Sequence, residues 1–463
     1  MTTVPAVPHG TPGVRDAPVP AGFSRDWWSG TVPFPTLRAA AVLAVAVPLL
    51  WLAPVTIPFW VPLVVVALAV AADACLTPAP WRIGVDRELP TTVALGTDSE
   101  LAWRVRNPVA RAVTVELADE LVPSLGAGSR RTRMTVPPSG RRRVTTRLAP
   151  TRRGTFTPTR VTVRVVGGLG LGQRQADRSL PGHLEVHPGF RSRAAAELRV
   201  RRHRVLDEGL RAIRARGAGT QFDTLRDYVE GDDVRRVDWT ATARAGHPVV
   251  RTFRAERNQQ VLALLDSGRL SAALVDGVPR LDHAMDALLA LATIAARSGD
   301  RTGMLAFGAE VRAVVPPRGD RGHLRRLSTA MHALQPELAE SDYGAAFRTA
   351  LGRFPSQATL VLFTELGAEA VEEQLLPALP LLTRRHAVTV VAVRDPALQR
   401  ARTMVARTVD DAYRTAAAAA IAAQRARTAS LLRRCGVQVV DAVPTDLAGA
   451  VADAYLETKA RGR

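Results

Sequence analysis

The rhythm of hydrophobic and polar positions changes several times along the chain, and each rhythm predicts a different kind of element. From Ala39 to Ala72 no residue is charged, which is longer than the about 20 residues that one membrane-spanning helix needs. Pro54 and Pro58 interrupt this run. We therefore predict two transmembrane helices within residues 37–77, joined as a hairpin; a single span with a broken end is the alternative.

The charged residues that flank the apolar run predict its orientation. Arg25 and Arg38 precede it, Arg82 and Arg87 follow it, and the predicted turn carries no charge. By the positive-inside rule both flanks are cytoplasmic. We expect a multi-pass protein of the cell membrane whose soluble domains lie in the cytoplasm. Residues 1–36, rich in Pro, Gly, Thr and Ser, are predicted to be disordered.

Residues 83–190 follow a period of two. Apolar and polar residues alternate in Leu101–Val105, Val113–Leu117 and Val161–Val165, as in half-buried strands. Pro and Gly pairs between these segments indicate turns. A small antiparallel β-sandwich is predicted here.

After a basic linker and a charged segment at residues 191–258, the pattern changes again. Residues 259–463 alternate continuous apolar runs with helical patterns, which is typical of a mostly parallel sheet covered on both faces. The expected strands are at 261–265, 302–307, 359–364, 387–393 and 437–441, and the expected helices at 281–298, 321–334, 342–353, 368–385, 397–434 and 446–460. The predicted fold class is α+β multidomain, with a doubly wound α/β domain at its end.

Composition narrows the possible partners. Basic residues number 62 against 43 acidic ones, a net charge of +19, and Lys459 is the single lysine. Aromatic residues are only 5%, and no recognition motif places them among the arginines, so no nucleic-acid partner is expected. Arg141–Arg143, at a predicted turn, are candidates for contact with anionic lipid headgroups, with a solvated arginine-rich face as the alternative. Cys75 and Cys435 predict no disulfide framework.

The most informative segment is residues 221–244, where arginines and aspartates are interleaved with large apolar residues. Leu225, Tyr228 and Val229 at helical spacing predict a helix, which Gly231 would end and after which Asp232 would cap the next turn. Opposite charges beside aromatic residues indicate a partly buried ion-pair network. A solvated pair of charged helices is the alternative.

This segment resembles the signature of a large bacterial family known as domain of unknown function 58. The matching residues are Phe222, Leu225, Arg226, Tyr228, Gly231, Asp232, Arg235, Asp238, Trp239, Ala243 and Arg244. The resemblance implies an N-terminal membrane hairpin, a β-rich segment, the signature and then a von Willebrand factor A-like domain. It also implies a cytoplasmic MoxR-type AAA+ ATPase as partner, in a chaperone-like assembly that acts on membrane or envelope proteins.

In von Willebrand factor A-like domains the first strand ends in Asp-x-Ser-x-Ser, which holds Mg²⁺ together with a Thr and an Asp from later loops. Here the segment reads Asp266-Ser267-Gly268-Arg269-Leu270, so both later serines are replaced. Ser341 stands at the Thr position and Glu365 at the later Asp position. Mg²⁺ needs several oxygen ligands, so we expect Asp266, Ser341 and Glu365 to meet at one edge of the sheet as a degenerate site, with Asp266, Arg269 and Glu365 serving as docking contacts.

These observations favour a membrane-anchored, non-enzymatic interaction protein without a resident cofactor. Two alternatives stay open. One is a nucleic-acid-binding protein that uses the basic linker. The other is a metal-dependent hydrolase that uses Asp232, Asp233 and Asp238, although their alternation with arginines favours neutralised ion pairs over an empty cation site.

Overall fold

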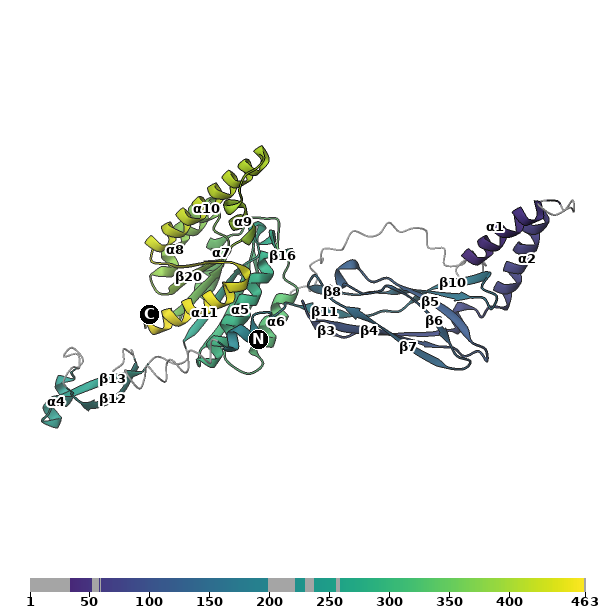
Figure 1. The fold of residues 1–463 in the computed structure, drawn as a ribbon. Coiled ribbons are helices and arrows are strands. Elements are labelled where there is room, and N and C mark those ends of the chain that lie inside the picture. Colours follow the sequence, from purple (N-terminus) through teal and green to yellow (C-terminus); the bar gives the residue numbers. More distant parts are fainter. Residues whose placement is uncertain are drawn as a thin grey trace, which may run out of the picture. The chain divides into compact units, whose positions relative to one another are not determined.

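The computed structural model describes residues 34–51, 58, 60–198, 221–229, 237–254 and 259–461. The chain divides into two compact units (Figure 1), each treated by itself below. The first, the sandwich unit, comprises Met1–Pro90, Glu100–Leu148 and Thr157–His183; the second, the α/β unit, comprises Thr91–Ser99, Ala149–Phe156 and Leu184–Arg463. The predicted boundary near residue 190 therefore differs from the structural one, because short segments of the β-rich region join the α/β unit.

Two apolar helices open the described part of the sandwich unit. They are α1 (Leu37–Trp51) and α2 (Trp60–Leu76), followed by the short helix η1 (Pro80–Arg82). Only Trp60–Arg82, with 23 residues and a mean hydropathy of 2.1, is long and apolar enough to cross a membrane among the described residues; the apolar stretch Leu37–Ala46 is shorter. The structure thus supports one spanning helix, and the predicted second span is not supported.

A buried carboxylate ties α2 to the sheet of the same unit. Asp73, 3% exposed, accepts hydrogen bonds from the backbone N–H groups of Leu169, Leu171 and Gly172, each at 2.9 Å. A Cβ atom at Gly172 would lie 2.5 Å from the Val70 carbonyl oxygen. A side chain at position 172 would therefore collide with α2, so the close approach of the strand to α2 requires glycine. The Asp73 carboxylate is tolerated in this buried place because it is hydrogen-bonded.

Two antiparallel sheets form the body of the sandwich unit. One has the order β1-β10-β9-β5-β6 and the other β2-β4-β7. Their strands are β1 (Phe34–Pro35), β2 (Gly84–Glu88), β4 (Ser99–Arg106), β5 (Val113–Asp119), β6 (Arg131–Val136), β7 (Arg141–Leu148), β9 (Arg160–Val166) and β10 (Gly172–Ser179), and η2 (Pro123–Leu125) follows β5. Trp103 of one sheet donates to Asp119 of the other at 2.7 Å, within a core of alternating buried residues.

Strand β1 lies in the segment that was predicted to be disordered. Phe34 pairs with Gln173 and Pro35 with Gly172, so the disorder prediction is wrong for these two residues. Edge pairing supplies hydrogen bonds that a turn-rich composition does not reveal. The rest of the predicted segment, residues 1–33, lies outside the described residues.

The α/β unit is built on a six-stranded sheet with the order β18-β17-β14-β19-β20-β21. All neighbours pair in parallel except β17 and β18. The strands are β14 (Gln260–Asp266), β17 (Arg301–Phe307), β18 (Val311–Arg318), β19 (Ala358–Phe363), β20 (Ala387–Val393) and β21 (Gln438–Ala442). The mixed α/β class is confirmed. Strand β18 escaped prediction because Pro316 and Pro317 argue against a central strand but are tolerated at an edge.

Helices cover both faces of this sheet (Figure 1). They are α5 (Arg280–Arg297), α6 (His323–His332), α7 (Tyr343–Arg353), α8 (Leu376–Thr383) preceded by η5 (Ala370–Leu375), α9 (Pro396–Thr403), α10 (Val409–Arg434) and α11 (Pro444–Ala460). Along β14 the side chains alternate between two cores: Val261, Ala263 and Leu265 pack with residues of α5, α6 and α11, whereas Leu262 and Leu264 pack with residues of α7, α8 and α10. The predicted helix 397–434 is two helices, α9 and α10.

Smaller elements complete this unit. The short strands β3 (Thr92–Ala94), β11 (Leu184–His187) and β8 (Gly154–Phe156) form a three-stranded sheet, and β15 (Leu274–Val275) and β16 (Val278–Pro279) follow the short helix η4 (Arg269–Ala272). The signature contributes an antiparallel pair, β12 (Gln221–Asp227) and β13 (Val249–Arg254), with α4 (Trp239–Ala245) between them.

Candidate functional site

The carboxyl edge of the parallel sheet is where the chain gathers polar side chains after apolar strands. Strand β14 pairs with β17 on one side and with β19 on the other, so the chain leaves β14 in one direction and later returns on the other side. Ligands of open α/β sheets bind at such a switch point, beyond the carboxyl ends of the strands. Asp266 ends β14 there, and Thr364 and Glu365 follow β19.

The Asp266 carboxylate is 4% exposed and is hydrogen-bonded by protein groups on both oxygens. Its Oδ1 accepts from the Gly268 N–H at 2.9 Å and from the Ser341 hydroxyl. Its Oδ2 accepts from the Thr364 hydroxyl at 2.6 Å and lies 3.1 Å from the Tyr343 hydroxyl. A carboxylate offers about four lone-pair sites, and the protein occupies them.

The Tyr343 hydroxyl completes this cluster from the first turn of α7. It lies 2.8 Å from Thr364 Oγ1 as well as near Asp266. The Tyr343 and Thr364 hydroxyls therefore share two hydrogens among three contacts: that between the two hydroxyls and that of each with Asp266. Burial, and then the negative charge of Asp266, raise the pKa of Tyr343. Tyr343 therefore stays protonated and acts as a hydrogen-bond donor.

Gly268 explains why this edge departs from the Asp-x-Ser-x-Ser pattern. A Cβ atom at this position would lie 2.0 Å from Ser341 Oγ and 3.2 Å from Asp266 Oδ1. A serine at 268 would thus collide with Ser341 in its present place. The residues present do not fit a Mg²⁺ ion, because its oxygen donors are either replaced or already hydrogen-bonded to one another.

Glu365 belongs to a second, separate cluster. It forms ion pairs with Arg280 at 3.2 Å and with Arg425 of α10, and Arg425 also pairs with Asp441 at 2.8 Å. Burial, and then the positive charge of Arg425, lower the pKa of Arg280. The structure thus brings Asp266 and Ser341 together but assigns Glu365 to arginines. Among the described residues, no group of three or more His, Cys, Asp or Glu side chains is placed to hold a metal ion.

Several residues of this edge were missed from the sequence. Thr364 carried a usable signal, since a hydroxyl that directly follows a predicted strand belongs to the same edge. Tyr343 lies two positions after the predicted ligand Ser341. Arg280 and Arg425 had no signal, because Arg280 precedes the predicted helix 281–298 and Arg425 is one of many arginines in the predicted helix 397–434.

A small cavity opens beside the Asp266 cluster. Its volume is about 240 Å³, and its lining includes Asp266, Arg269, Glu340, Ser341 and Tyr343. Arg269, the third predicted docking contact, pairs with Glu340 at 3.2 Å, and both side chains are more than half exposed. The predicted contacts Asp266 and Arg269 therefore line one cavity, Asp266 buried and Arg269 at the surface.

The signature differs from its predicted structure. Residues 221–227 form strand β12 instead of a helix, and β12 pairs with β13. The helical spacing of Leu225, Tyr228 and Val229 was misleading, because antiparallel pairing with a distant segment overrides a three-residue pattern. Leu225 and Val229 are 44% and 46% exposed.

Asp238 is the capping residue that the structure describes in the signature, whereas the predicted cap Asp232 lies outside the described residues. Its carboxylate accepts from the N–H groups of Thr240 and Ala241 at 3.0 and 3.1 Å, which begins α4. Trp239 is 67% exposed and Arg244 lies in the last turn of α4. The structure thus gives Asp238 a capping role, and the predicted ion-pair network stays a prediction, since its arginine Arg235 lies outside the described residues.

Other parts of the signature stay untested by the structure. Gly231, Asp232, Asp233 and Arg235 lie outside the described residues, and so does most of the basic linker. For Phe222 and Arg226 the structure describes the strand but not the side chains.

An exposed apolar surface lies at the junction of α9 and α10, which we call the α9–α10 tip (residues 402–414). Val405, Val409 and Tyr413 are 78%, 72% and 74% exposed, and Met404 is 38% exposed. None of the buried residues of α10 precedes Ala418. A soluble protein rarely leaves so many large apolar side chains together in water unless they bind a partner.

Comparison with known proteins identifies relatives but no activity. A family model described as "Protein of unknown function DUF58" matches residues 224–429. Uncharacterized protein Rv1480 of Mycobacterium tuberculosis and uncharacterized protein Mb1516 of Mycobacterium bovis are each 30% identical over 244 residues, which cover 48% of this chain and 74% of each relative.

Solved structures add little. The solution structure of the CARDB domain of PF1109 from Pyrococcus furiosus is 15% identical and covers 21% of this chain and 94% of its own, with a TM-score of 0.14. The crystal structure of that domain in complex with di-metal ions gives 16%, 21% and 91%, again with a TM-score of 0.14. A likeness this weak carries no argument about the present chain. The family match and the mycobacterial relatives do carry one: the chain belongs to the DUF58 family of proteins of unknown function.

Proposed function

We propose that this chain is a membrane-anchored, non-enzymatic interaction protein whose α/β unit binds a partner through the α9–α10 tip. The observation that carries the proposal is the exposure of Val405, Val409 and Tyr413 on one short segment. Tyrosine is enriched in binding hot spots, and a contiguous exposed apolar patch is typical of an interaction site.

The chemistry of the carboxyl edge supports a binding role over a catalytic one. Asp266 is buried and hydrogen-bonded by Ser341, Thr364 and Gly268, and Glu365 is neutralised by two arginines. A general base or metal ligand needs a free lone pair in reach of substrate. The clusters at this edge instead contribute to the stability of the fold.

The strand order of the six-stranded sheet supports a von Willebrand factor A-like assignment for this unit. Parallel strands β14, β17, β19, β20 and β21, one antiparallel edge strand and helices on both faces agree with the domain that the family resemblance implies. Such a domain would present its partner with a rigid surface, and the α9–α10 tip would be the part of that surface with the largest apolar area.

Membrane anchoring is the second part of the proposal. The helix Trp60–Arg82 supports one spanning segment. In the proposed arrangement α1 provides the second passage, arginines on both flanks keep the two units in the cytoplasm, and other membrane or envelope proteins are the clients of the assembly.

The proposed partner is the MoxR-type AAA+ ATPase that the family resemblance implies. Arg402, Arg407, Arg414 and Asp410 lie exposed around the apolar tip, and Asp411 is held in a capping box with Thr408. Three arginines against two aspartates leave this rim with one net positive charge, which is complementary to an acidic, apolar partner surface.

Binding of the purified ATPase to the detergent-purified full chain tests this proposal. Val409→Asp and Tyr413→Asp should each weaken binding at least about tenfold, because a carboxylate would be desolvated in the interface. Leu338→Asp is the matched control, since Leu338 is 86% exposed on the same unit but lies away from the tip in sequence. Failure of the wild-type chain to bind, or equal binding by all variants with unchanged melting temperatures, would refute the proposed partner surface.

A further inference from the structure

The outward-facing side chains of the five-stranded sheet lie in rows that cross β6, β5, β9 and β10. The register aligns four residues in a first row, the ladder row: Arg133, Glu116, Arg164 and Gln175. Glu116 lies 3.5 Å from Nη1 of Arg133 and 3.5 Å from Nη1 of Arg164. Arg164 also donates to Gln175 at 2.9 Å. Every charged group in the ladder row thus has a partner within the sheet.

The next row crosses the same four strands but has no carboxylate on β5. The register aligns Arg131, Ala118, Thr162 and Asp177. Ala118 occupies the place on β5 that Glu116 occupies in the ladder row. Among the described residues, no carboxylate or hydrogen-bond acceptor pairs with the Arg131 guanidinium. At the far end of the row Asp177 accepts from Thr162 at 2.6 Å and lies 3.9 Å from Arg160.

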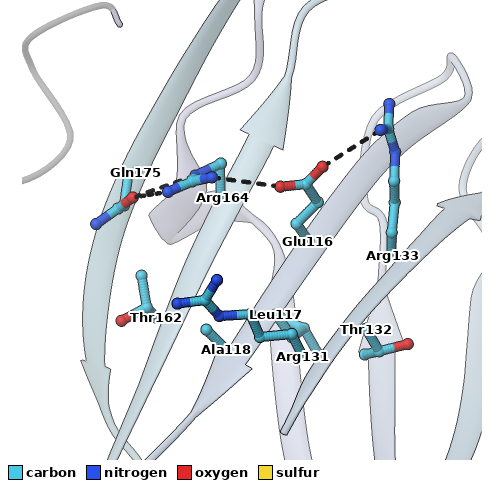
Figure 2. Close-up of a pocket in the computed structure, with 9 residues that line it drawn as sticks. All are labelled: Glu116, Leu117, Ala118, Arg131, Thr132, Arg133, Thr162, Arg164 and Gln175. Carbon is cyan, nitrogen blue, oxygen red and sulfur yellow. Dashed lines mark hydrogen bonds and ion pairs between the residues drawn. The ribbon is translucent and has the colours of Figure 1, made fainter. Parts of the chain in front are cut away.

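The missing side chain leaves a hollow. A pocket of about 400 Å³ lies over Ala118, and its charged lining is Arg131, Arg133, Arg164 and Glu116. Figure 2 shows the Arg131 side chain extending over Ala118 toward Thr162, while Glu116 holds Arg133 and Arg164 on the other side of the pocket. Three arginines against one carboxylate give this pocket a formal excess of two positive charges.

We propose that this pocket is a binding site for a phosphate group, which takes the place of the absent carboxylate opposite Arg131. An arginine guanidinium matches phosphate with paired N–H donors. The double positive excess favours a dianionic phosphate over a singly charged carboxylate. The small Ala118 side chain leaves the room that the ligand fills, and Arg164 and the Gln175 amide border it.

The phosphate could be free in solution or part of a lipid headgroup, and both sources present the same group to Arg131. The probes are therefore inorganic phosphate and dioctanoyl phosphatidate, each titrated calorimetrically into the detergent-purified full chain at constant ionic strength. We expect saturable binding of phosphate near one equivalent. Tighter binding of phosphatidate at the same site would assign the headgroup as the source, and weaker binding would assign the free anion.

Two variants test the site from opposite directions. Arg131→Gln should weaken phosphate binding about tenfold or more, because a charge-assisted pair is lost. Ala118→Glu should abolish binding, because it supplies from the protein the carboxylate that the row lacks. Both positions face outward, and unchanged melting temperatures would verify folding.

The matched control is Arg104→Gln, which removes an exposed arginine from the other sheet of the same unit. It should bind phosphate like the wild type. If Arg104→Gln weakens binding as much as Arg131→Gln, the attraction is that of the overall positive charge and the proposed site is refuted. Absence of saturable phosphate binding, or undiminished binding by Ala118→Glu, would also overturn it.

Discussion

Two glutamates of this protein each lie between two arginines, and their surroundings make them opposites. Glu365 of the α/β unit has 7% of its side chain exposed, between Arg280 and Arg425 at 18% and 9%. Glu116 of the sandwich unit has 29% exposed, between arginines at 58% and 41%. The same residue types therefore form a buried structural pair in one unit and a solvated ladder in the other.

This difference in burial indicates which charged clusters can bind a ligand. Buried charges must be satisfied by the protein itself, since water cannot reach them, and at the carboxyl edge Asp266 is hydrogen-bonded on both oxygens while Glu365 is neutralised by two arginines. An exposed ladder carries no such requirement, so a position such as Arg131 can be left without a carboxylate and remain available to a ligand. In this protein the Asp266 carboxylate at the carboxyl edge is occupied by protein donors, whereas the Arg131 guanidinium on the sheet face is not paired with a carboxylate among the described residues.

The largest expected effect separates the two glutamates. Glu365→Ala should destabilise the α/β unit by about 3–5 kcal/mol, because it leaves the largely buried Arg280 without its ion-pair partner and leaves Arg425 with Asp441 alone. Glu116→Ala, the matched exposed pair, should cost about 0–1 kcal/mol. Chemical unfolding of the full chain, followed by hydrogen exchange in each unit, measures both. Equal losses would mean that burial does not distinguish the two clusters.

A somewhat smaller effect is expected at Asp266. Asp266→Ala should cost about 2–4 kcal/mol, since the Ser341 hydroxyl and the Gly268 N–H lose their acceptor at about 1–2 kcal/mol each, within the range of about 1–3 kcal/mol per unpaired group, while the Thr364 hydroxyl keeps its contact with Tyr343. Asp266→Asn keeps one oxygen acceptor and should recover part of the loss. If Asp266→Ala leaves stability unchanged, the cluster is not what holds this edge together.

Acidification should act on the α/β unit through two buried histidines. Burial lowers the pKa of His323 and of His386, so the fold prefers them neutral. Their unfolded pKa is about 6.5; the stability they contribute is therefore complete above that pH and is lost as the pH falls below it. Melting curves between pH 7.5 and pH 5.5 should show this loss as a fall of the melting temperature. His323→Gln or His386→Gln should make the melting temperature depend less on pH.

The smallest effect concerns the signature. Asp238→Ala removes a helix cap and should cost about 1 kcal/mol, within the range of about 0.5–2 kcal/mol for such caps. The loss of a buried ion pair would cost about 3–5 kcal/mol. Thermal unfolding of the full chain distinguishes the two, and a loss in the larger range would restore the buried network that the sequence first suggested.

The sequence predicted the parts of this fold that rest on long, regular patterns. Continuous apolar strands such as Val261–Leu265 and alternating ones such as Val113–Leu117 are set by burial on two faces or on one. The strand at Gln221–Asp227 could not be predicted, because its partner β13 lies more than twenty positions away and its own spacing suits a helix. At the candidate site, the predicted strand ends located Asp266 and Glu365. Only side-chain packing could show that the Tyr343 and Thr364 hydroxyls hydrogen-bond Asp266 and that Arg425 forms an ion pair with Glu365.

The most direct test of the central claim, that the carboxyl edge is closed, is a calorimetric Mg²⁺ titration of the detergent-purified full chain beside Asp266→Asn. Since the hydrogen bonds around Asp266 must break before an ion can bind, we predict no saturable uptake at millimolar Mg²⁺ and identical traces for both proteins. Stoichiometric Mg²⁺ uptake by the wild type that Asp266→Asn abolishes would contradict the account and show a working metal site at this edge.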